Sequence, residues 1–353
     1  MYFAIFWKNH EYSLKEINLI QPQNLKIKWN IAFFDDCNFD LVPNLGGVVK
    51  FWRVIKDNEL SDLVSGKLVG TNDKNFGNYL KKEFGALRYK LLDIQTSNLD
   101  VKKTWVELLL FKNIQDIGFE SDFQKGSFVW LVFEYQNINF YSQIDFDKPV
   151  SGMQVGMIPS KLANIMINIG VVNSGIPSKN VNIYDPFVWF GTIWFVCNWL
   201  GFNFIWSDIN ITPAKQNFKW WQKTSSFDPK KLFKLYKHDV REKFSKNFLK
   251  SVNLIVSEWY LWPVIRKNTN NKQFLDNQNK IFDLYTNFFE NVFDFWWKIN
   301  IVITVPYYLN YDWNILQQQL WNYLTKNNIK HKFMNTIYKR QGQLVWRQIL
   351  IIG

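Results

Sequence analysis

The residues NIYDPFVWFGTIWFVCNWLGFNFIWSDI, at positions 182–209, carry the clearest structural signal in the chain. A short apolar run ends in Asp185, a turn with Gly191 follows, and after a further apolar stretch a second run ends in Asp208. Strands that are apolar on both faces are typical of a parallel sheet whose two faces are covered by helices. The segment therefore predicts a consecutive strand, turn, helix and strand of a doubly wound α/β sheet.

The sequence pattern changes near residue 150, where we expect a domain boundary. Residues 146–159, FDKPVSGMQVGMIP, contain proline and glycine and show little periodicity, which is typical of a linker. Residues 1–150 combine short strands and helices and predict a small α+β region of the ferredoxin-like type. Residues 151–353 predict a Rossmann-like α/β sheet, and their last two strands, at 331–338 and 344–352, predict an antiparallel hairpin at its edge.

Capping and periodicity locate the other elements. Ser13 and Glu16 have the spacing of a capping box and predict a helix that runs to Ile20. We also expect helices at 73–84, 100–111, 161–169 and 192–200, and strands at 2–6, 27–34, 46–55, 127–135, 182–184, 202–207, 233–237, 252–256 and 299–304.

The composition favours a globular protein with a polyanionic partner. Among 353 residues there are 42 Lys and Arg and 30 Asp and Glu, which gives a formal net charge of +12, and the sequence pI is about 9.4. A basic surface of this size is typical of proteins that bind nucleic acid. The alternative is a proteome that is rich in lysine and asparagine throughout, in which case the charge says nothing about a partner.

Cysteine and histidine are too few for most metal or thiol chemistry. Cys37 and Cys197 match no zinc or redox spacing, and there are 3 histidines. We therefore expect no metal site and a reducing, cytoplasmic setting. Residues 187–206 approach the length of a membrane span. Because Asn198 and Asn203 interrupt that run, we expect no membrane segment.

Tryptophan is unusually frequent and stands where glycine is expected. The chain has 18 Trp and 16 Gly, whereas the usual share of roughly 7% would give about 25 Gly in a chain of this length. At turns and strand ends the backbone often requires a residue without a Cβ. We therefore predict that many of these tryptophans are UGA codons that the source organism translates as glycine; the alternative is a core that is rich in tryptophan. The positions concerned include Trp52, Trp189, Trp206, Trp262 and Trp346, whereas Trp220 or Trp221 is expected to be a true tryptophan.

Acidic residues end successive expected strands of the C-terminal region. A doubly wound sheet binds its ligand at the carboxyl ends of its strands, and here those ends carry Asp185, Asp208 and Asp239. A nucleotide site commonly has an acidic ribose ligand about 20 residues after its first turn, which fits Asp208, while Asp239 is placed to accept from an adenine amine. Each acid alone is equally explained as a helix N-cap. A nicotinamide cofactor is the other alternative, but its GxGxxG turn does not match DPFVWFGT even with glycine in place of Trp189.

With these residues in place, the chain resembles the THUMP-associated tRNA guanosine methyltransferases, in particular their short bacterial and archaeal members. The family motif DPF-x-G-x-GT is similar to DPFVWFGT, which differs at Trp189, and GSDI is similar to WSDI, which differs at Trp206. Most mismatches are Trp for Gly, which supports translation of UGA as glycine. The other similar segments are FAIFWKNHEYSLKEI (3–17), DFDKP (145–149), VGMIPSKLANIMINI (155–169), where Ser160 replaces a proline, and GQLVWRQILII (342–352).

The resemblance implies an N-terminal, THUMP-like region that binds tRNA and a C-terminal domain that uses S-adenosylmethionine to methylate the exocyclic amine of a guanine. It implies that Asp208, with the neighbouring Ile209, holds the ribose of the cofactor and that Asp239 and Val240 hold its adenine. The residues implied to surround the methionine moiety are Asp185, Pro186, Phe187, Trp189, Gly191 and Thr192, with Pro159 and Lys161 at its end.

The expected catalytic segment departs from the family pattern. Amine methyltransferases place Asp/Asn-Pro-Pro-Tyr after the fourth strand, where a polar group accepts from the amine and the aromatic ring stacks on the flipped base. This chain has SEWYLWP at 257–263, so Ser257 stands in the Asp/Asn position, Glu258 is the nearby carboxylate and Tyr260 fits the stacking position. The other interpretations are a helix-capping acid with a core tyrosine, a DNA adenine or cytosine amine methyltransferase, and an inactive RNA-binding relative.

Overall fold

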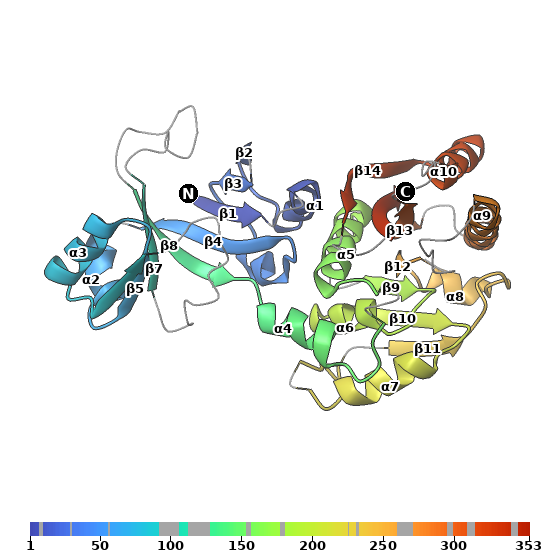
Figure 1. Ribbon diagram of the computed structural model, residues 1–353, viewed down its shortest axis with the longest axis horizontal. Helices are drawn as coiled ribbons and strands as arrows, with labels where there is room; N and C mark the ends of the chain where they lie inside the picture. The colour runs from blue at the N-terminus through green and yellow to red at the C-terminus, as the bar shows by residue number, and fades with distance from the viewer. Residues whose placement is uncertain are drawn as a thin grey trace. The chain divides into compact units, whose positions relative to one another are not determined.

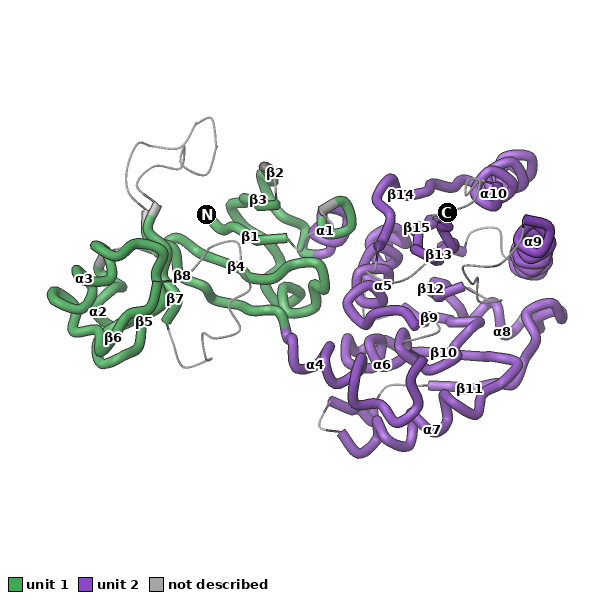
Figure 2. The backbone as a smooth tube through the Cα atoms, in the orientation of Figure 1, with its two compact units in different colours: residues 1–13, 20–136 green, residues 14–19, 137–353 purple. Residues whose placement is uncertain are grey.

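The structure is a computed structural model, and its described residues form two compact units. Unit 1 comprises residues 1–13 and 20–136, and unit 2 comprises residues 14–19 and 137–353 (Figure 2). Residues 137–150, which we predicted to belong to the N-terminal region, therefore pack with the C-terminal one. The described residues are 1–6, 10–28, 30–55, 57–91, 106–111, 128–152, 157–176, 181–224, 226–230, 233–259, 271–294, 299–308, 315–339 and 345–353.

Unit 1 is built on an eight-stranded sheet with the strand order β2-β3-β1-β4-β8-β7-β5-β6 (Figure 1). Strand β1 lies between β3 and β4 and is antiparallel to both, and β2 pairs with the outer side of β3. This is the βαββαβ arrangement of ferredoxin-like folds, so the predicted fold type is confirmed for the first part of the unit. The elements are β1 (Tyr2–Phe6), α1 (His10–Glu16), η1 (Ile17–Ile20), β2 (Lys26–Lys28), β3 (Ile31–Phe34), η2 (Phe39–Asn44) and β4 (Val48–Ile55).

The second part of unit 1 extends this sheet, and one of our predictions for it is wrong. Its elements are α2 (Asp57–Val64), β5 (Leu68–Thr71), α3 (Lys74–Glu83), β6 (Arg88–Leu91), β7 (Val106–Phe111) and β8 (Phe128–Tyr135). The helix predicted at 100–111 is a strand where it is described, because β7 pairs with β5 on one side and β8 on the other. Leucine favours helices weakly, and burial of Leu108 and Leu109 between neighbouring strands overrides that preference.

Two further local predictions for unit 1 are wrong. Ser13 does not begin a helix, because α1 starts at His10 and the Ser13 hydroxyl donates to the carbonyl oxygen of Gly47 at 2.7 Å. The strand predicted at 27–34 is divided into β2 and β3, which pair as an antiparallel hairpin with Asn30 in the turn. Asparagine favours turns because its side chain hydrogen-bonds the local backbone.

Unit 2 is built on a seven-stranded sheet with the order β11-β10-β9-β12-β13-β15-β14. Its first five strands in chain order are parallel where they pair, and their spatial order, 3-2-1-4-5, is that of a doubly wound sheet. Strand β15 lies antiparallel between β13 and the edge strand β14. The predicted Rossmann-like sheet with an antiparallel edge is therefore confirmed. The strands are β9 (Asn182–Asp185), β10 (Asn203–Asp208), β11 (Phe233–Lys237), β12 (Leu254–Glu258), β13 (Asn300–Tyr308), β14 (His331–Tyr338) and β15 (Val345–Ile352).

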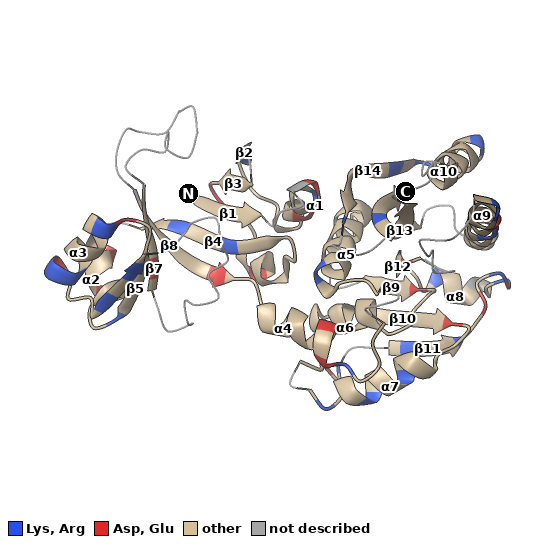
Figure 3. Ribbon diagram, viewed as in Figure 1, with Lys and Arg blue, Asp and Glu red and all other residues tan. Residues whose placement is uncertain are grey.

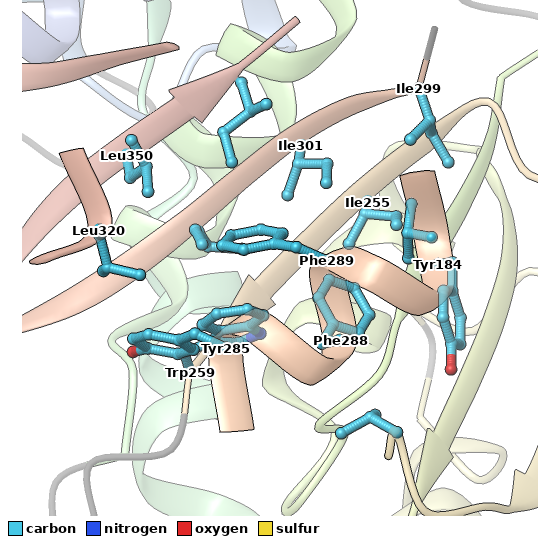
Figure 4. Close-up of a cluster of buried hydrophobic side chains, with 14 of the residues drawn as sticks. Tyr184, Ile255, Trp259, Tyr285, Phe288, Phe289, Ile299, Ile301, Leu320 and Leu350 are labelled. Atoms are coloured by element: carbon cyan, nitrogen blue, oxygen red, sulfur yellow. The ribbon is translucent and has the colours of Figure 1, made fainter. Parts of the chain in front are cut away.

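Helices cover both faces of this sheet. On one face the ring of Trp206 contacts those of Trp194 in α6 and Phe218 in α7. On the other face Ile205 and Ile301 belong to a large apolar cluster that includes side chains of α9 and α10 (Figure 4). Neighbouring strand residues thus point into different cores, which explains the continuous apolar runs of the sequence. The helices are α4 (Ile138–Ser142), η4 (Gln143–Asp147), α5 (Ser160–Ser174), α6 (Thr192–Trp199), α7 (Thr212–Trp221), α8 (Lys246–Lys250), α9 (Asn271–Phe293) and α10 (Ile315–Lys326).

Candidate cofactor and active site

A pocket lies at the carboxyl ends of β9 and β12, two neighbouring parallel strands of unit 2. From β9 the chain continues to β10 on one side, whereas β12 lies on the other side. Doubly wound sheets bind their ligands at this point, where the strand order reverses. The empty space in the pocket, including its opening to solvent, is about 230 Å³. The residues that line it are Met157, Ile158, Asp185, Phe187, Val188, Trp189, Phe190, Thr192, Ile193 and Glu258.

Asp185 is the buried acid at the end of β9. Its Oδ1 accepts hydrogen bonds from Ser257 Oγ at 2.6 Å and from the backbone N–H of Phe187 at 3.0 Å. Burial raises the pKa of Asp185 to about 7, although both hydrogen bonds lower it. Ser257, which we predicted to be catalytic, is fully buried and lies behind the pocket as a hydrogen-bond donor to this acid.

Glu258 ends β12, lines the pocket and is held by two partners. Its Oε1 accepts from Arg347 Nε at 2.6 Å, and its Oε2 accepts from the backbone N–H of Ile158 at 2.6 Å. Burial raises the pKa of Glu258, while the Arg347 guanidinium and the bond from Ile158 lower it. Arg347 is not among the residues that we predicted to form the site. Its signal was an arginine inside the apolar run of β15, because arginine is almost never fully buried unless it is paired.

The turn after β9 has a backbone conformation that suits glycine at two positions. Gly191 has a φ of +82° and Trp189 a φ of +42°. Asparagine tolerates this left-handed region, but a bulky residue there is an outlier. In the described part of the chain, the other non-glycine residues with positive φ are Gln21, Asn24 and Asn328. The backbone at position 189 therefore supports the prediction that this residue is glycine.

The side chain of Trp189 also takes up space in the pocket. Its ring stacks on that of Phe190, with the ring centres 4.5 Å apart, and it lines the pocket. Glycine in place of Trp189 would therefore enlarge the pocket.

Asp208 ends β10 beside the same turn. Its Oδ2 accepts from the backbone N–H of Trp189 at 3.0 Å, and its Oδ1 accepts from that of Asn210 at 3.0 Å. Burial raises the pKa of Asp208, and these backbone hydrogen bonds lower it. The next residue, Ile209, is 60% exposed. Neither Asp208 nor Ile209 lines the pocket, so the backbone of the turn is what connects Asp208 to it.

Asp239 and Val240 follow β11 and do not line the pocket. The guanidinium of Arg241 donates to both carboxylate oxygens of Asp239, and this interaction lowers the pKa of Asp239. Val240 is 3% exposed and packs in the apolar cluster of unit 2, while its carbonyl oxygen accepts from Asn291 Nδ2 at 2.9 Å. Both residues are thus engaged by protein groups.

Some of the residues that follow Asp185 line the pocket and others do not. Phe187 and Thr192 line the pocket, whereas Pro186 is buried directly after Asp185 without lining it. Tyr260, which we predicted to stack on the substrate base, lies outside the described residues.

The segment that leads into α5 approaches the pocket from a different part of the chain. Pro159 is the N-cap residue of α5, and the backbone N–H of Ser160 donates to Asp145 Oδ1 at 2.9 Å. Lys161 places its Nζ 5.7 Å from the ring centre of Tyr141, and burial lowers the pKa of Lys161. Pro159 and Lys161 do not line the pocket, whereas Met157 and Ile158 of the same segment do.

The buried tryptophans fall into two groups by their indole N–H. Trp221 Nε1 donates to Asn198 Oδ1 at 3.0 Å. A buried tryptophan usually finds such a partner, and an unpaired buried donor destabilises the fold. The indole nitrogens with no hydrogen-bond partner in the structure, all on buried side chains of described residues, belong to Trp52, Trp130, Trp206 and Trp259.

Neither a metal cluster nor a membrane helix is found in the described part of the chain. No group of three or more His, Cys, Asp or Glu side chains among those residues is placed to hold a metal ion. No helix there combines the length and the apolar character needed to cross a membrane. Residues 187–206 instead form the turn after β9, helix α6 and most of β10.

No protein-family model and no curated protein sequence matches the chain. Several solved structures are similar to it in part. The methyltransferase domain of METTL16, in a delta-N form, is 10% identical with a TM-score of 0.41, and the match covers 61% of this chain and 94% of that one. A human methyltransferase 10 domain containing protein is 9% identical with a TM-score of 0.39, over 61% of this chain and 95% of that one. TYW2 of M. jannaschii, in complex with AdoMet, is 13% identical with a TM-score of 0.35, over 57% and 78% of the two chains. Because these TM-scores are low, the fold assignment rests on the strand order of unit 2.

Proposed function

We propose that this protein is an S-adenosylmethionine-dependent RNA methyltransferase that acts on a guanine exocyclic amine in tRNA, and that its functional form has glycine at position 189. The observation that carries the proposal is the pocket at the point where the strand order reverses. Three features meet there. Strand β9 ends in Asp185, the turn that follows has a backbone that suits glycine, and Glu258 ends the neighbouring strand β12. This arrangement suits a cofactor on the β9 side and a reacting group at the end of β12.

The turn and the start of α6 fit the methionine moiety of the cofactor. Gly191, the N-cap residue of α6, provides no side-chain cap, so the first backbone N–H groups of this helix are free to bind a carboxylate. Asp208 fits the ribose hydroxyls, because its carboxylate stands at the end of the next strand. When bound, the cofactor supplies an electrophilic methyl group on a positively charged sulfur.

Glu258 fits the substrate amine. Each of its oxygens accepts one protein hydrogen bond, and a carboxylate has about four lone-pair sites, so it can accept from an amine as well. Because Arg347 and the Ile158 backbone fix its position, Glu258 orients the amine nitrogen toward the methyl group. In that position Glu258 would accept one proton of the amine while the nitrogen takes up the methyl group that a bound cofactor would supply.

The nucleic-acid substrate is supported by the charge of the chain and by the fold of unit 1. The net charge of +12 favours a polyanionic partner, and the ferredoxin-like arrangement of β1 to β4 agrees with the RNA-binding region that the family resemblance implies. We propose that unit 1 binds tRNA and unit 2 carries the chemistry.

Methyl transfer by the full chain with Trp189→Gly tests the proposal. The protein is incubated with labelled S-adenosylmethionine and either unmodified tRNA or duplex DNA. We expect label in tRNA, on the exocyclic amine of one guanine. Label in DNA alone would favour the DNA amine methyltransferase, and tRNA binding without transfer would favour the inactive relative. If the protein binds no cofactor, the whole proposal is wrong.

A matched pair of substitutions tests the role of Glu258. We expect Glu258→Gln to lower the rate of transfer at least 100-fold with S-adenosylhomocysteine binding retained, whereas Glu290→Gln, at an exposed position on α9, leaves the rate unchanged. The codon for position 189 is a separate check, because a UGG codon there would remove the case for glycine.

A further inference from the structure

Lys148 is a buried lysine beside the candidate cofactor pocket. It is not among the site residues that we predicted from the sequence. It is 3% exposed. Its Nζ donates to Thr192 Oγ1 at 2.7 Å and lies 6.0 Å from the ring centre of Phe195. Thr192 is the first residue of α6 and lines the pocket. The ammonium group therefore stands next to the uncapped N-terminus of α6.

The segment that carries Lys148 is fixed on both sides. On one side, Asp145 accepts a hydrogen bond from the backbone N–H of Ser160 at 2.9 Å. On the other, the Asn217 side chain of α7 bonds both the backbone N–H and the carbonyl oxygen of Val150, at 2.9 and 2.8 Å. Asn217 Nδ2 also donates to the carbonyl oxygen of Phe190 in the turn after β9, at 2.9 Å. One side chain thus holds the lysine segment and the pocket turn together.

The hydrogen-bonding capacity of Lys148 is mostly unused. An ammonium group has three N–H donors, and within the described residues the one hydrogen bond of Nζ goes to Thr192. Asp145 and Glu258 act on it at longer range, and burial lowers the pKa of Lys148 to about 7. A buried cation without a paired anion is unfavourable. An anionic ligand in the pocket would supply the missing partner.

We infer that Lys148 binds the carboxylate of the cofactor's methionine moiety, together with the backbone N–H groups at the start of α6. The inference rests on the proposed function. Two independent features point to an anion at this position: the unused donors of a lysine that is almost completely buried, and a helix N-terminus without a side-chain cap. The hydrogen bond to Thr192 Oγ1 holds the ammonium group of Lys148 at the start of α6.

Two ligands that differ in one group test this assignment. The full chain with Trp189→Gly is titrated with S-adenosylhomocysteine and with the same thioether lacking the carboxylate, and dissociation constants are measured by calorimetry. We expect the protein with Lys148 to bind S-adenosylhomocysteine at least 10-fold more tightly than the decarboxylated ligand. With Lys148→Met, we expect this ratio of affinities to fall at least 3-fold, because the ammonium contact to the carboxylate is lost while the backbone N–H groups of α6 remain.

The outcomes separate this inference from the proposed function. If the protein with Lys148 binds neither ligand, the proposed function fails. If it binds both and Lys148→Met discriminates between them as strongly as Lys148 does, the inference is wrong and the lysine is structural. Binding of the decarboxylated ligand shows that the variant has folded. Should Lys148→Met bind neither ligand, Lys148→Arg decides: retained discrimination supports the cation–carboxylate contact, and its loss overturns it.

Discussion

Trp189 and Trp221 belong to the same unit and are related to their surroundings in opposite ways. Trp221 ends α7, is fully buried and donates its indole N–H to Asn198. Trp189 lies in the turn after β9 with a φ of +42° and occupies the pocket. A true core tryptophan has a partner for its polar atom and a relaxed backbone. The surroundings of position 221 suit a tryptophan, whereas the backbone at position 189 favours a glycine.

The largest effect is expected from replacing Trp221, the tryptophan that has a hydrogen-bond partner. We expect Trp221→Gly to lower the free energy of unfolding by about 4 kcal/mol, because it removes a large buried side chain and places glycine at a helix end. Urea denaturation followed by circular dichroism measures this loss. A loss below about 1 kcal/mol would show that position 221 does not need a tryptophan, and the contrast with position 189 would disappear.

Arg347 is another buried side chain whose polar group has a partner, because it forms an ion pair with Glu258. We expect Arg347→Met to lower the free energy of unfolding by about 3 kcal/mol or more, because it leaves Glu258 buried without its cation. The double variant Arg347→Met/Glu258→Gln should recover part of this loss, since no uncompensated charge then remains. The same denaturation experiment applies. A double variant that is less stable than the single one would contradict the ion pair as the cause.

These contacts also mark the limit of what could be predicted from the sequence. Strands β9 and β10 were predictable because burial on both faces leaves a local apolar run, and a turn leaves its glycine. The partner of Glu258 was not, because Arg347 lies 89 positions further along the chain and no local pattern records such a contact. The same holds for Lys148 and Thr192, 44 positions apart. The strand at 106–111 was mistaken for a helix because its pairing partners in β5 and β8 lie outside the local segment from which the helix was predicted.

Substitution of Trp189 in the turn after β9 is expected to have the opposite effect on stability. We expect Trp189→Gly to raise the affinity for S-adenosylhomocysteine at least 100-fold, because it opens the pocket, and to raise the free energy of unfolding by about 1 kcal/mol, because it relieves a left-handed backbone strain. Trp189→Ala is the matched control: it opens the pocket but keeps a Cβ at positive φ, so it should gain affinity without the same gain in stability. Equal stabilities of the two variants would argue against a glycine site.

Lys148 offers a smaller effect that depends on pH. Burial lowers its pKa from 10.5 to about 7, against the opposing charges of Asp145 and Glu258. Between these values the unfolded chain holds a proton that the folded protein has released, so this group makes the free energy of unfolding rise with pH, by up to about 1.4 kcal/mol per pH unit. Lys148→Met lacks the group. We therefore expect the free energy of unfolding of the protein with Lys148, relative to that of Lys148→Met, to increase from pH 7 to pH 9. A difference that stays constant over this range would contradict the lowered pKa.

The smallest expected effect compares the two units as surfaces for tRNA. Lys81 and Lys82 are exposed on α3 of unit 1 (Figure 3), whereas Lys326 is exposed at the end of α10 in unit 2. We expect Lys81→Glu/Lys82→Glu to weaken tRNA binding about 10-fold at low salt and to reduce its dependence on salt, because fewer counterions are released on binding. Lys326→Glu, the control, should change the affinity less than 2-fold. Filter binding at several salt concentrations measures both quantities. A larger effect of Lys326→Glu would move the tRNA-binding surface to unit 2.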